Sequence, residues 1–387
     1  MIRTKYLELI KSQYRIHSVC AILGARQVGK TTLARQYAAQ QSKKYVIFDL
    51  EDPEALLALD NPKMILSQYE GQLIIIDEIQ RKPELFPILR VLVDHPEKKY
   101  QFLILGSASR DLIRQSSETL AGRIGYIELP PFIIEEVGQE QQLLLRGGFP
   151  LSFLAQTDVD SFAWRKAYIQ TFLERDLHML GFDNIAPMGM YKFWMMLCYY
   201  HGQLANNAEI SKSLMISRQM ATRYLEILAG TFMVRVLQPW YENIGKRQIR
   251  SPKIYFRDSG LLTCLMGIRE THDLNMHARS GAIWEGFAIE QILQCLQVRN
   301  EEAYFWSTSN EAELDLLIFI HGKRIGFEFK YADAPKMTNS MFVALEDLKL
   351  DHLFIIFPGE TTFPMKDKIT AFSLKLIDRL PGLVEKL

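Results

Sequence analysis

Short apolar runs alternate with helical patterns over the first part of the chain. The runs resemble buried strands and lie at residues 18–23, 45–50, 73–76, 100–105 and 124–129. Strands that alternate with helices are typical of a parallel sheet. The sequence therefore predicts an α/β domain over residues 1–150, capped by a short basic amphipathic helix at residues 1–16. The breakers P-P at 130–131 and R-G-G-F-P at 146–150 place its end near residue 150.

Helical patterns dominate the middle of the chain. Residues 158–182 predict a helix inside a connector that spans residues 151–186. Over residues 187–268 the pattern predicts three helices and then two strands, which is a helix-turn-helix with a wing. The last of these helices, at residues 218–228, follows Ser217, a residue type favoured at helix N-caps. The two strands are expected at residues 232–237 and 253–256.

A third pattern begins after residue 281. A helix that includes residues 284–290 precedes strands at residues 314–319 and 325–330, which a turn connects. We therefore expect a third domain, also α/β, over residues 269–387. The fold class predicted for the whole chain is α/β with a winged helix-turn-helix in the middle.

Composition narrows the class of protein. The 387 residues contain 45 Lys+Arg and 45 Asp+Glu, so no overall charge points to nucleic acid or membrane, and any such site must be a local patch. The four cysteines form no C-x-x-C pair and are expected to be buried thiols of a reducing, cytoplasmic protein. No apolar run approaches the roughly 18–20 residues that cross a bilayer, so no membrane partner is expected.

Residues 24–31 read G-A-R-Q-V-G-K-T, which is the G-x-x-x-x-G-K-T phosphate-binding pattern between a predicted strand and a predicted helix. Backbone N–H groups and the positive end of the helix dipole would point at the phosphates of ATP. Lys30 would reach the β- and γ-phosphates, and Thr31 would ligate Mg²⁺. The predicted nucleotide-binding residues are Gly24, Ala25, Arg26, Gln27, Val28, Gly29, Lys30, Thr31 and Thr32.

A second motif strengthens the ATPase prediction. Four apolar residues run directly into Asp77 and Glu78, as in a buried strand that ends at an active-site edge. Asp77 would hold the Mg²⁺ shell and Glu78 would polarise the attacking water. Taken alone, the pair could also be a core strand that meets a solvated turn. Following a phosphate loop, it favours ATP hydrolysis.

Two further residues are candidates for the same site. Ser107 follows the strand at residues 100–105 and could sense the γ-phosphate, although an ordinary small-residue turn explains it equally well. Arg123, in the string L-A-G-R, could stabilise charge on phosphate in its own site or in that of a neighbour, which would require a homo-oligomer. The alternative is an arginine on a solvated loop. Arg110 and Arg114 are weaker candidates for this role.

The predicted winged helix suggests contact with DNA. Leu225 and Leu228 can face inward on the last helix, which leaves polar residues outward, as in a recognition helix. Between the two strands, with Lys253, lies a basic cluster that could contact phosphate. Winged helices also serve as lids and protein-binding modules, so both uses remain open. The candidate nucleic-acid residues are Arg218, Gln219, Arg223, Lys246, Arg247 and Arg250.

Carboxylates mark the C-terminal strands. Paired strands that carry Asp315 and Glu328 would bring these carboxylates together around Mg²⁺, and Lys330 would point to the same face as Glu328. Glu285, from the preceding helix, could complete the site. This is a pattern of metal-dependent phosphodiester hydrolysis. Such a fold can also persist as a binding module without cleavage.

Several strings together resemble a known family, the prokaryotic ATPases of the AAA superfamily that carry a C-terminal domain of unknown function. The resemblance covers nearly the whole chain and implies an AAA-type ATPase core, a winged helix and a C-terminal domain similar to restriction-endonuclease-like folds. Glu285, Asp315, Glu328 and Lys330 then fall where such nucleases keep their metal site. The strings that carry the resemblance are residues 24–31, 77–78, 120–123, 146–150 and 251–260.

Two hypotheses follow from the sequence. In the first, ATP binding or hydrolysis repositions the winged helix and a C-terminal nuclease on nucleic acid. In the second, the ATPase drives a switch or scaffold, and the C-terminal domain binds a partner without cleaving it.

Overall fold

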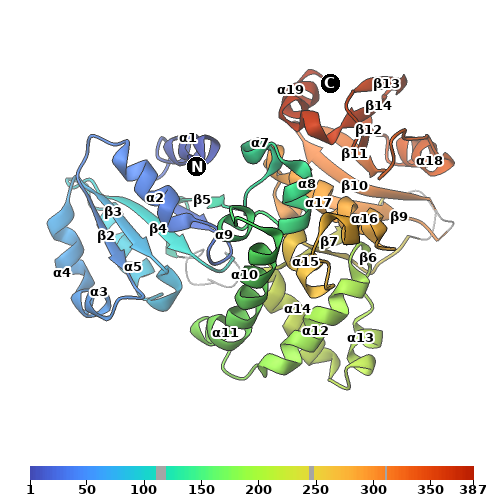
Figure 1. Ribbon diagram of the computed structural model, residues 1–387. Helices are drawn as coiled ribbons and strands as arrows, with labels where there is room; N and C mark the ends of the chain where they lie inside the picture. The colour runs from blue at the N-terminus through green and yellow to red at the C-terminus, as the bar shows by residue number, and fades with distance from the viewer. Residues whose placement is uncertain (110–118, 244–247, 310–311) are drawn as a thin grey trace. The chain divides into compact units, whose positions relative to one another are not determined.

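The computed structural model describes residues 1–109, 119–243, 248–309 and 312–387. These residues form two compact units. Unit 1 comprises Met1–Pro131, Thr171–Ile185 and Gly230–Phe232, and unit 2 comprises the remainder. The chain therefore passes between the units more than once along its length (Figure 1). The predicted division into four consecutive domains stays a prediction.

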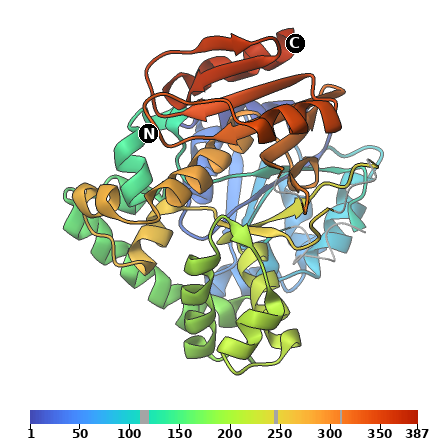
Figure 2. The same ribbon diagram turned by 90° about the vertical axis from the view of Figure 1, so that its right-hand side faces the viewer.

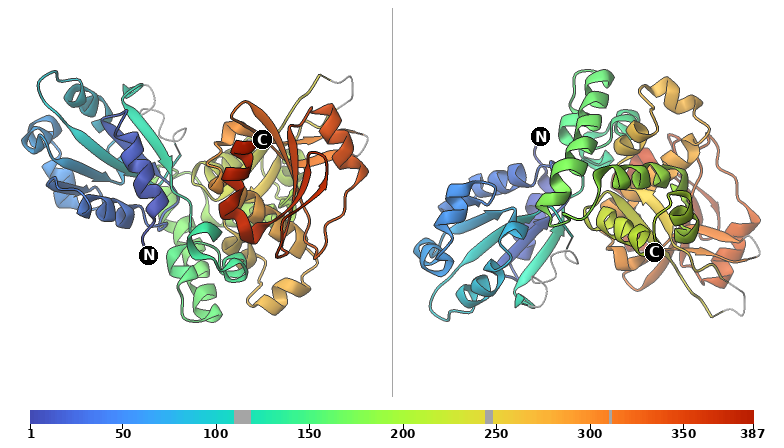
Figure 3. Two further views of the ribbon diagram at one scale, coloured as in Figure 1. Left: turned by 90° about the horizontal axis from the view of Figure 1, so that it is seen from above. Right: turned by 90° about the horizontal axis from the view of Figure 1, so that it is seen from below.

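Unit 1 contains a five-stranded parallel sheet, which confirms the predicted α/β fold (Figures 1 and 3). Its strands follow the order β2-β3-β4-β1-β5, and every pairing is parallel. The strands are β1 (Val19–Leu23), β2 (Tyr45–Asp49), β3 (Leu73–Asp77), β4 (Gln101–Gly106) and β5 (Ile124–Glu128). The helical elements between and before them are α1 (Thr4–Gln13), α2 (Lys30–Ala39), α3 (Pro53–Ala58), α4 (Pro62–Leu66), η1 (Ser67–Tyr69), η2 (Ile79–Arg81) and α5 (Leu85–Val93).

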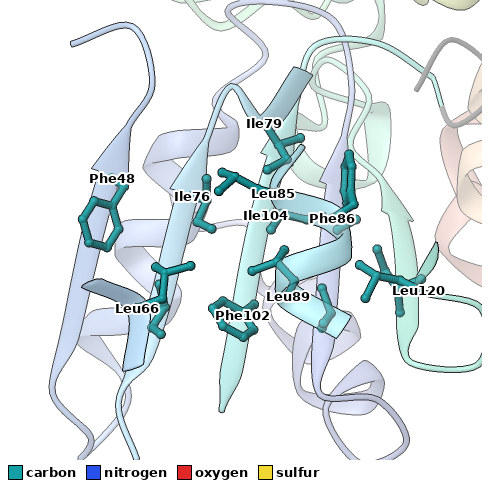
Figure 4. Packing of buried hydrophobic residues seen from close by; sticks show 14 of the residues in the cluster. Phe48, Leu66, Ile76, Ile79, Leu85, Phe86, Leu89, Phe102, Ile104 and Leu120 are labelled. Carbon is teal, nitrogen blue, oxygen red and sulfur yellow. The ribbon is translucent and has the colours of Figure 1, made fainter. Parts of the chain in front are cut away.

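One face of this sheet carries the apolar side of α5. Figure 4 shows Phe86 and Leu89 of this helix near Ile76 of β3 and Ile104 of β4. These four side chains are almost completely buried. Burying an apolar side chain of this size stabilises a fold by roughly 1.5–3 kcal/mol. The packing therefore holds the carboxyl ends of β3 and β4, where polar residues begin.

A later segment of the chain belongs to unit 1. Helix α10 (Asp158–Thr171) is followed by a π-helical turn, η3 (Phe172–Asp176), and by α11 (Leu177–Met179). Thr171–Ile185 belongs to unit 1, which contains the parallel sheet, although the sequence predicted a simple connector here. Single π-helical turns are rare and are often found at functional sites.

The first part of unit 2 is mainly helical. Helices α12, α13 and α14 come in succession, β6 lies between the first two, and strands β7 and β8 follow. The antiparallel pairing of β8 with both β6 and β7 produces a small sheet beside the helices. The bounds are α7 (Ile134–Val137), α8 (Glu140–Arg146), α9 (Pro150–Phe153), α12 (Pro187–Tyr200), β6 (Gln203–Leu204), α13 (Asn207–Ser213), α14 (Arg218–Gly230), β7 (Val234–Pro239), β8 (Lys253–Phe256), α15 (Ser259–Leu265) and α16 (Thr271–Met276).

The C-terminal part of unit 2 supplies most of a second sheet, drawn in orange and red in Figure 2. Helix α17 precedes three antiparallel strands, β9 to β11, and α18 then leads to β12, which pairs parallel with β11. The bounds are α17 (Ser280–Cys295), η4 (Asn300–Glu302), β9 (Ala303–Ser307), β10 (Glu313–Ile320), β11 (Lys323–Phe329), α18 (Asn339–Asp347), β12 (His352–Phe357), β13 (Phe363–Lys366), β14 (Ile369–Ser373), η5 (Leu374–Arg379) and α19 (Leu380–Lys386).

The two small sheets of unit 2 are continuous. Strand β7 pairs parallel with β9 through Gln238↔Tyr304 and Pro239↔Phe305. The result is a nine-stranded sheet with the order β13-β14-β12-β11-β10-β9-β7-β8-β6. The hairpin of the predicted winged helix and the C-terminal strands therefore share one sheet, across the boundary that the sequence predicted at residue 268.

Candidate functional sites: a phosphate loop and a cluster of carboxylates and lysines

The phosphate loop joins β1 to α2 in unit 1. Gly29 is the N-cap of α2 and has a φ of 94°, a left-handed conformation that glycine adopts without strain. Gly24 has no room for a side chain, because a Cβ there would lie 2.3 Å from the carbonyl oxygen of Leu129. Because glycine has no side chain that could cap α2, the N-terminal N–H groups of the helix remain available to bind an anion. The loop therefore has the shape of a phosphate cradle.

Lys30 lies inside this cradle. Its Nζ donates hydrogen bonds to the carbonyl oxygens of Gly24 (3.0 Å) and Ala25 (2.9 Å), and to Ser107 Oγ (3.0 Å). Burial lowers the pKa of Lys30, while the negative charges of Glu78 and Asp77 act in the opposite direction. All three present partners of Nζ are neutral, so a phosphate oxygen could replace them with a stronger, charge-assisted bond.

Thr31 and Asp77 form the part of the site suited to Mg²⁺. Thr31 Oγ1 donates a 2.6 Å hydrogen bond to Asp77 Oδ2. Burial raises the pKa of Asp77, and the hydrogen bond from Thr31 partly offsets that shift. A hydroxyl and a carboxylate oxygen are ligands that Mg²⁺ accepts beside phosphate and water. Together with the cradle and Lys30, these residues fit a bound Mg²⁺-ATP.

Glu78 is held in position directly after Asp77. Its φ of 55° is left-handed, which is uncommon for a residue with a side chain. Ser107 Oγ donates to Glu78 Oε1 at 2.9 Å, so Ser107 connects Glu78 with Lys30. Gln80, which the sequence analysis missed, also bonds Glu78 through its amide nitrogen, and its amide oxygen accepts from the Ser107 backbone N–H. The structure thus brings Lys30, Glu78 and Ser107 together.

A second set of charges surrounds the same loop. Arg26 pairs with Glu51, which follows β2, and lies 3.2 Å from Asp176 Oδ1. Arg175 lies 3.5 Å from the same Glu51. Burial raises the pKa of Asp176, and the Arg26 charge opposes that shift. The returning segment Thr171–Ile185 therefore contributes side chains beside the phosphate loop, and only its polar string E-R-D in a helical pattern could have indicated this.

Arg123 occupies a different place from the one proposed for it. It directly precedes β5, and its carbonyl accepts from the N–H of Val19, at the amino end of β1. The phosphate loop follows the carboxyl end of β1, one strand length away, and five residues span roughly 16 Å. The Arg123 side chain pairs with Asp94 at 2.5 Å. Within its own chain Arg123 does not reach the loop, and a role in a neighbour's site stays a prediction.

In unit 2, the predicted carboxylates and lysine also gather. Lys330 Nζ lies 3.0 Å from Glu328 Oε2, and Asp315 Oδ2 accepts from the Phe329 N–H at 3.1 Å. Burial raises the pKa of Glu328 to about 8, with the Asp315 charge adding to the shift. Burial and Asp315 likewise raise the pKa of Glu285 to about 7. Glu285 and Glu328 belong to one electrostatic cluster, because the charge of Asp315 raises the pKa of both.

Three residues of this cluster were not assigned to it from the sequence. Lys253 Nζ pairs with Glu313 and lies 3.8 Å from Asp315 Oδ1. Tyr255 donates a 2.7 Å hydrogen bond to Glu285 Oε1. Lys253 was grouped with the basic cluster that could contact phosphate, but its side chain is only 7% exposed and engaged in these ion pairs. Lys253 does not belong to an exposed basic cluster because strand β8 lies inside the sheet between β6 and β7.

The cluster does not fit a metal ion in this arrangement. Within the described ranges, no group of three or more His, Cys, Asp or Glu residues is placed to hold one. The carboxylates instead accept from Tyr255, from the backbone and from two lysines. A Mg²⁺ site needs carboxylate oxygens that are free to converge on a single point.

Four of the six candidate nucleic-acid residues lie within the described part of the chain. Arg218, Gln219 and Arg223 are exposed on α14, and Arg250 is exposed before β8. Leu225 and Leu228 of α14 are buried, as expected. Lys246 and Arg247, like Arg110 and Arg114, lie outside the described residues.

The strings R-G-G-F-P and D-S-G meet inside unit 2. Asp258 caps α15 by accepting from Leu261 N, and it also accepts from Gly148 N at 2.8 Å. A Cβ on Gly147 would lie 2.1 Å from Asp258, and one on Gly260 would lie 2.1 Å from the Arg146 carbonyl. The glycines are therefore required by the close approach of two backbones. These parts of the strings are structural.

Comparison with known proteins gives relatives of the whole chain and of its parts. Two curated relatives, the uncharacterised proteins Mb2031c of Mycobacterium bovis and Rv2008c of Mycobacterium tuberculosis, are each 47% identical to this chain over 355 residues. The alignment covers 91% of this chain and 79% of each relative. This chain belongs to their family. Its residues 17–138 match the AAA domain family, which confirms the predicted AAA-type P-loop protein.

Two further segments of the chain match families without an assigned function. Residues 138–272 match the domain of unknown function DUF8612, and residues 280–377 match the domain of unknown function DUF4143. Among solved structures, the Walker-type ATPase PABY2304 of Pyrococcus abyssi is 13% identical, with a TM-score of 0.44, over 68% of this chain and 95% of that one. The RuvB Holliday junction branch migration motor of Thermotoga maritima is 15% identical, with a TM-score of 0.30, over 65% and 90%.

These TM-scores are low, so the family membership of this chain rests on the two mycobacterial relatives. Within the described part of the chain, no helix is both long enough and apolar enough to cross a membrane.

Proposed function

We propose that this protein binds Mg²⁺-ATP at the phosphate loop and hydrolyses it, and that unit 2 responds to the nucleotide while it binds nucleic acid. The observation that carries the ATPase proposal is the pair of contacts made by Ser107, to Lys30 Nζ and to Glu78 Oε1. These contacts connect a phosphate-binding cation with a carboxylate that can activate water. An accidental match to the loop pattern would not require this connection.

Each residue of the site has a separate task in this proposal. The N–H groups of the loop and Lys30 bind the phosphates, and Thr31 and Asp77 hold Mg²⁺. When bound, the metal ion neutralises charge on the phosphates. Glu78 orients the attacking water and accepts its proton, and Ser107 positions Glu78. Gln80 restrains Glu78 from the other side.

The order of elements in unit 2 supports nucleic-acid binding. Three helices, with a short strand after the first, precede the hairpin β7–β8, and this short strand pairs with β8. That order is typical of a winged helix, and α14 is the last of its three helices. Its exposed Arg218, Gln219 and Arg223 are suited to phosphate and base edges of DNA. The same surface could instead bind a protein.

The C-terminal elements support a restriction-endonuclease-like fold without supporting cleavage. From α17 to β12 the order is one helix, three antiparallel strands, one helix and a parallel strand. The sequence left open whether Glu285, Asp315, Glu328 and Lys330 cleave nucleic acid with Mg²⁺ or belong to a domain that only binds. Because the carboxylates are engaged by other donors, we favour a C-terminal domain that binds a partner without cutting it.

Phosphate release from Mg²⁺-ATP, measured with and without duplex DNA, tests the proposal. We expect the wild type to release phosphate, DNA to stimulate the rate, and Lys30→Ala to abolish it. Lys323→Ala, which removes the same charge from β11 of unit 2, is the matched control and should retain the rate. Hydrolysis that is indifferent to DNA at low salt would support the switch that works on another partner. Absence of hydrolysis by the wild type would refute the ATPase proposal.

A homo-oligomer is proposed only through Arg123. If neighbouring chains complete one another's sites, Arg123→Ala should lower the rate of phosphate release, and mixing it with Lys30→Ala should restore part of that rate. If the mixture is no more active than its components, Arg123 has no role between subunits.

A further inference from the structure

Strand β8 places two of its residues against the carboxylates of unit 2. Side chains alternate along a strand, so Lys253 and Tyr255 point to one side, and Ile254 and Phe256 to the other. Ile254 and Phe256 are buried apolar residues. Lys253 and Tyr255 contact Glu313 and Glu285, respectively. The string K-I-Y-F therefore supplies polar groups to a cluster that lies in a different part of the chain.

Lys253 is a cation surrounded by carboxylates. Its Nζ is paired with Glu313 and lies 3.8 Å from Asp315, while its side chain is almost completely buried. Two carboxylates this close to Nζ favour the charged form of the ammonium.

Each carboxylate of the cluster already has a partner from the protein. Tyr255 donates to Glu285, the backbone of Phe329 donates to Asp315, and Lys330 donates to Glu328. Glu313 has Lys253. Such partners replace the water that a carboxyl group loses on burial. The two lysines thus provide the positive charge that a bound cation would otherwise provide.

We propose that the ammonium of Lys253 is the resident cation of this cluster and takes the place of a divalent metal ion, so that the C-terminal domain works without metal. The proposal is independent of ATP hydrolysis in unit 1. It explains why the carboxylates lie together although no described group of three can hold a metal. A dication beside the ammonium would be repelled by a like charge that burial keeps out of water.

Titration of Mn²⁺ into the full-length protein without nucleotide tests the proposal by calorimetry. We expect the wild type and Asp315→Asn to give the same titration, because the cluster binds no metal in either. Lys253→Met removes the ammonium and leaves a hydrophobic stem of similar length. It should gain a Mn²⁺ site at least about tenfold tighter than any in the wild type, since Glu313 and Asp315 then lack the cation beside them. Asp315→Asn in the Lys253→Met background should remove the new site.

The matched control is Lys323→Met, which changes the net charge equally on β11 but has no part in the cluster. It should titrate like the wild type. A wild-type site that Asp315→Asn abolishes would overturn the proposal, and this comparison does not require Lys253→Met to fold. A folded Lys253→Met that binds Mn²⁺ no better than the wild type would overturn it as well. Phosphate release from ATP, measured in the same proteins, distinguishes either outcome from a failure of the ATPase proposal.

Discussion

The phosphate loop and the carboxylate cluster use the same residue types in opposite ways. In unit 1, Lys30 donates to two carbonyl oxygens and a hydroxyl, all of them neutral. In unit 2, Lys253 pairs with one carboxylate and lies close to a second. The first lysine can exchange its partners for a phosphate at a gain, whereas the second would lose charged partners. A lysine near acidic residues can therefore bind a ligand only where its interaction with the ligand is stronger than its interactions with its present partners.

If this distinction holds, substitutions in unit 1 should change activity, and those in unit 2 should change stability. Glu78→Gln should have the largest effect. It retains the shape of the side chain but removes the proton acceptor, so kcat for ATP hydrolysis should fall by about 10²–10⁴-fold. The affinity for ATP and the midpoint of urea unfolding should stay close to those of the wild type. Phosphate release, nucleotide titration and urea unfolding measure the three quantities. A large loss of stability would show that Glu78 is structural.

Asp258→Ala, in unit 2, should change stability and not activity. It removes the cap of α15 and leaves the buried N–H of Gly148 without an acceptor. The free energy of unfolding of unit 2 should fall by about 2–3 kcal/mol, the sum of a lost cap and an unsatisfied donor. The midpoint of urea unfolding measures this loss. Asp258→Asn, which keeps one acceptor oxygen, should lose less. Equal stability of the alanine variant and the wild type would contradict the structural role.

The contribution of His201 to the stability of unit 2 should depend on pH. Its Nδ1 accepts from Phe256 N and its Nε2 donates to the Ala282 carbonyl, which only the neutral ring can do. Burial, with the Arg279 charge adding to it, lowers the pKa of His201 to about 3. Because the unfolded ring titrates near 6.5, its stabilising contribution is complete above that pH and is lost as the pH falls toward 3. Between pH 7 and pH 5 the loss should be about 2 kcal/mol.

The raised pKa values of Asp258, Glu285 and Glu328 act in the opposite direction, since their contributions are lost as the pH rises. The quantity to measure is therefore the difference in unfolding free energy between the wild type and His201→Gln, whose amide can accept and donate at any pH. That difference should shrink on acidification. The matched control, His272→Gln at an exposed position, should show no such change. A difference that is constant with pH would contradict a neutral His201.

Asp176→Asn should give the smallest effect, and it tests the charges around the phosphate loop. Asp176 lies against Arg26, which belongs to the loop itself. Without the carboxylate, more of the Arg26 charge is available to phosphate, so ATP should bind up to about fivefold more tightly, or about 1 kcal/mol. Nucleotide titration measures this change, with Asp183→Asn in the same segment as the control. Weaker binding would mean that Asp176 instead positions Arg26 for the nucleotide.

Much of unit 1 could be predicted because its signals are local. The apolar runs at residues 18–23 and 73–76 correspond to β1 and β3, and the glycines of the loop are adjacent in sequence to Lys30 and Thr31. Parallel strands bring their carboxyl ends to one edge of a sheet. Asp77 and Ser107, each next to a strand end, were therefore predictable members of the site.

Two residues lie elsewhere than expected for one physical reason. Arg123, in the string L-A-G-R, was a candidate for its own phosphate site, but it precedes a strand, and the two ends of a parallel strand lie at opposite edges of the sheet. Lys253 was assigned by its charge, but the pairing of β8 on both sides places it inside a sheet. In both cases the immediate sequence says nothing about which strands become neighbours.

The sequence by itself therefore determined the parallel sheet, the phosphate cradle and the identity of the charged residues. Only the tertiary structure decided that Thr171–Ile185 contributes side chains beside the phosphate loop, and that Lys253 and Tyr255 meet Glu313 and Glu285. The reason is that a loop and its flanking elements are specified by adjacent residues. The partner of a buried charge depends instead on strand order and register, which burial of the apolar faces of the whole sheet selects.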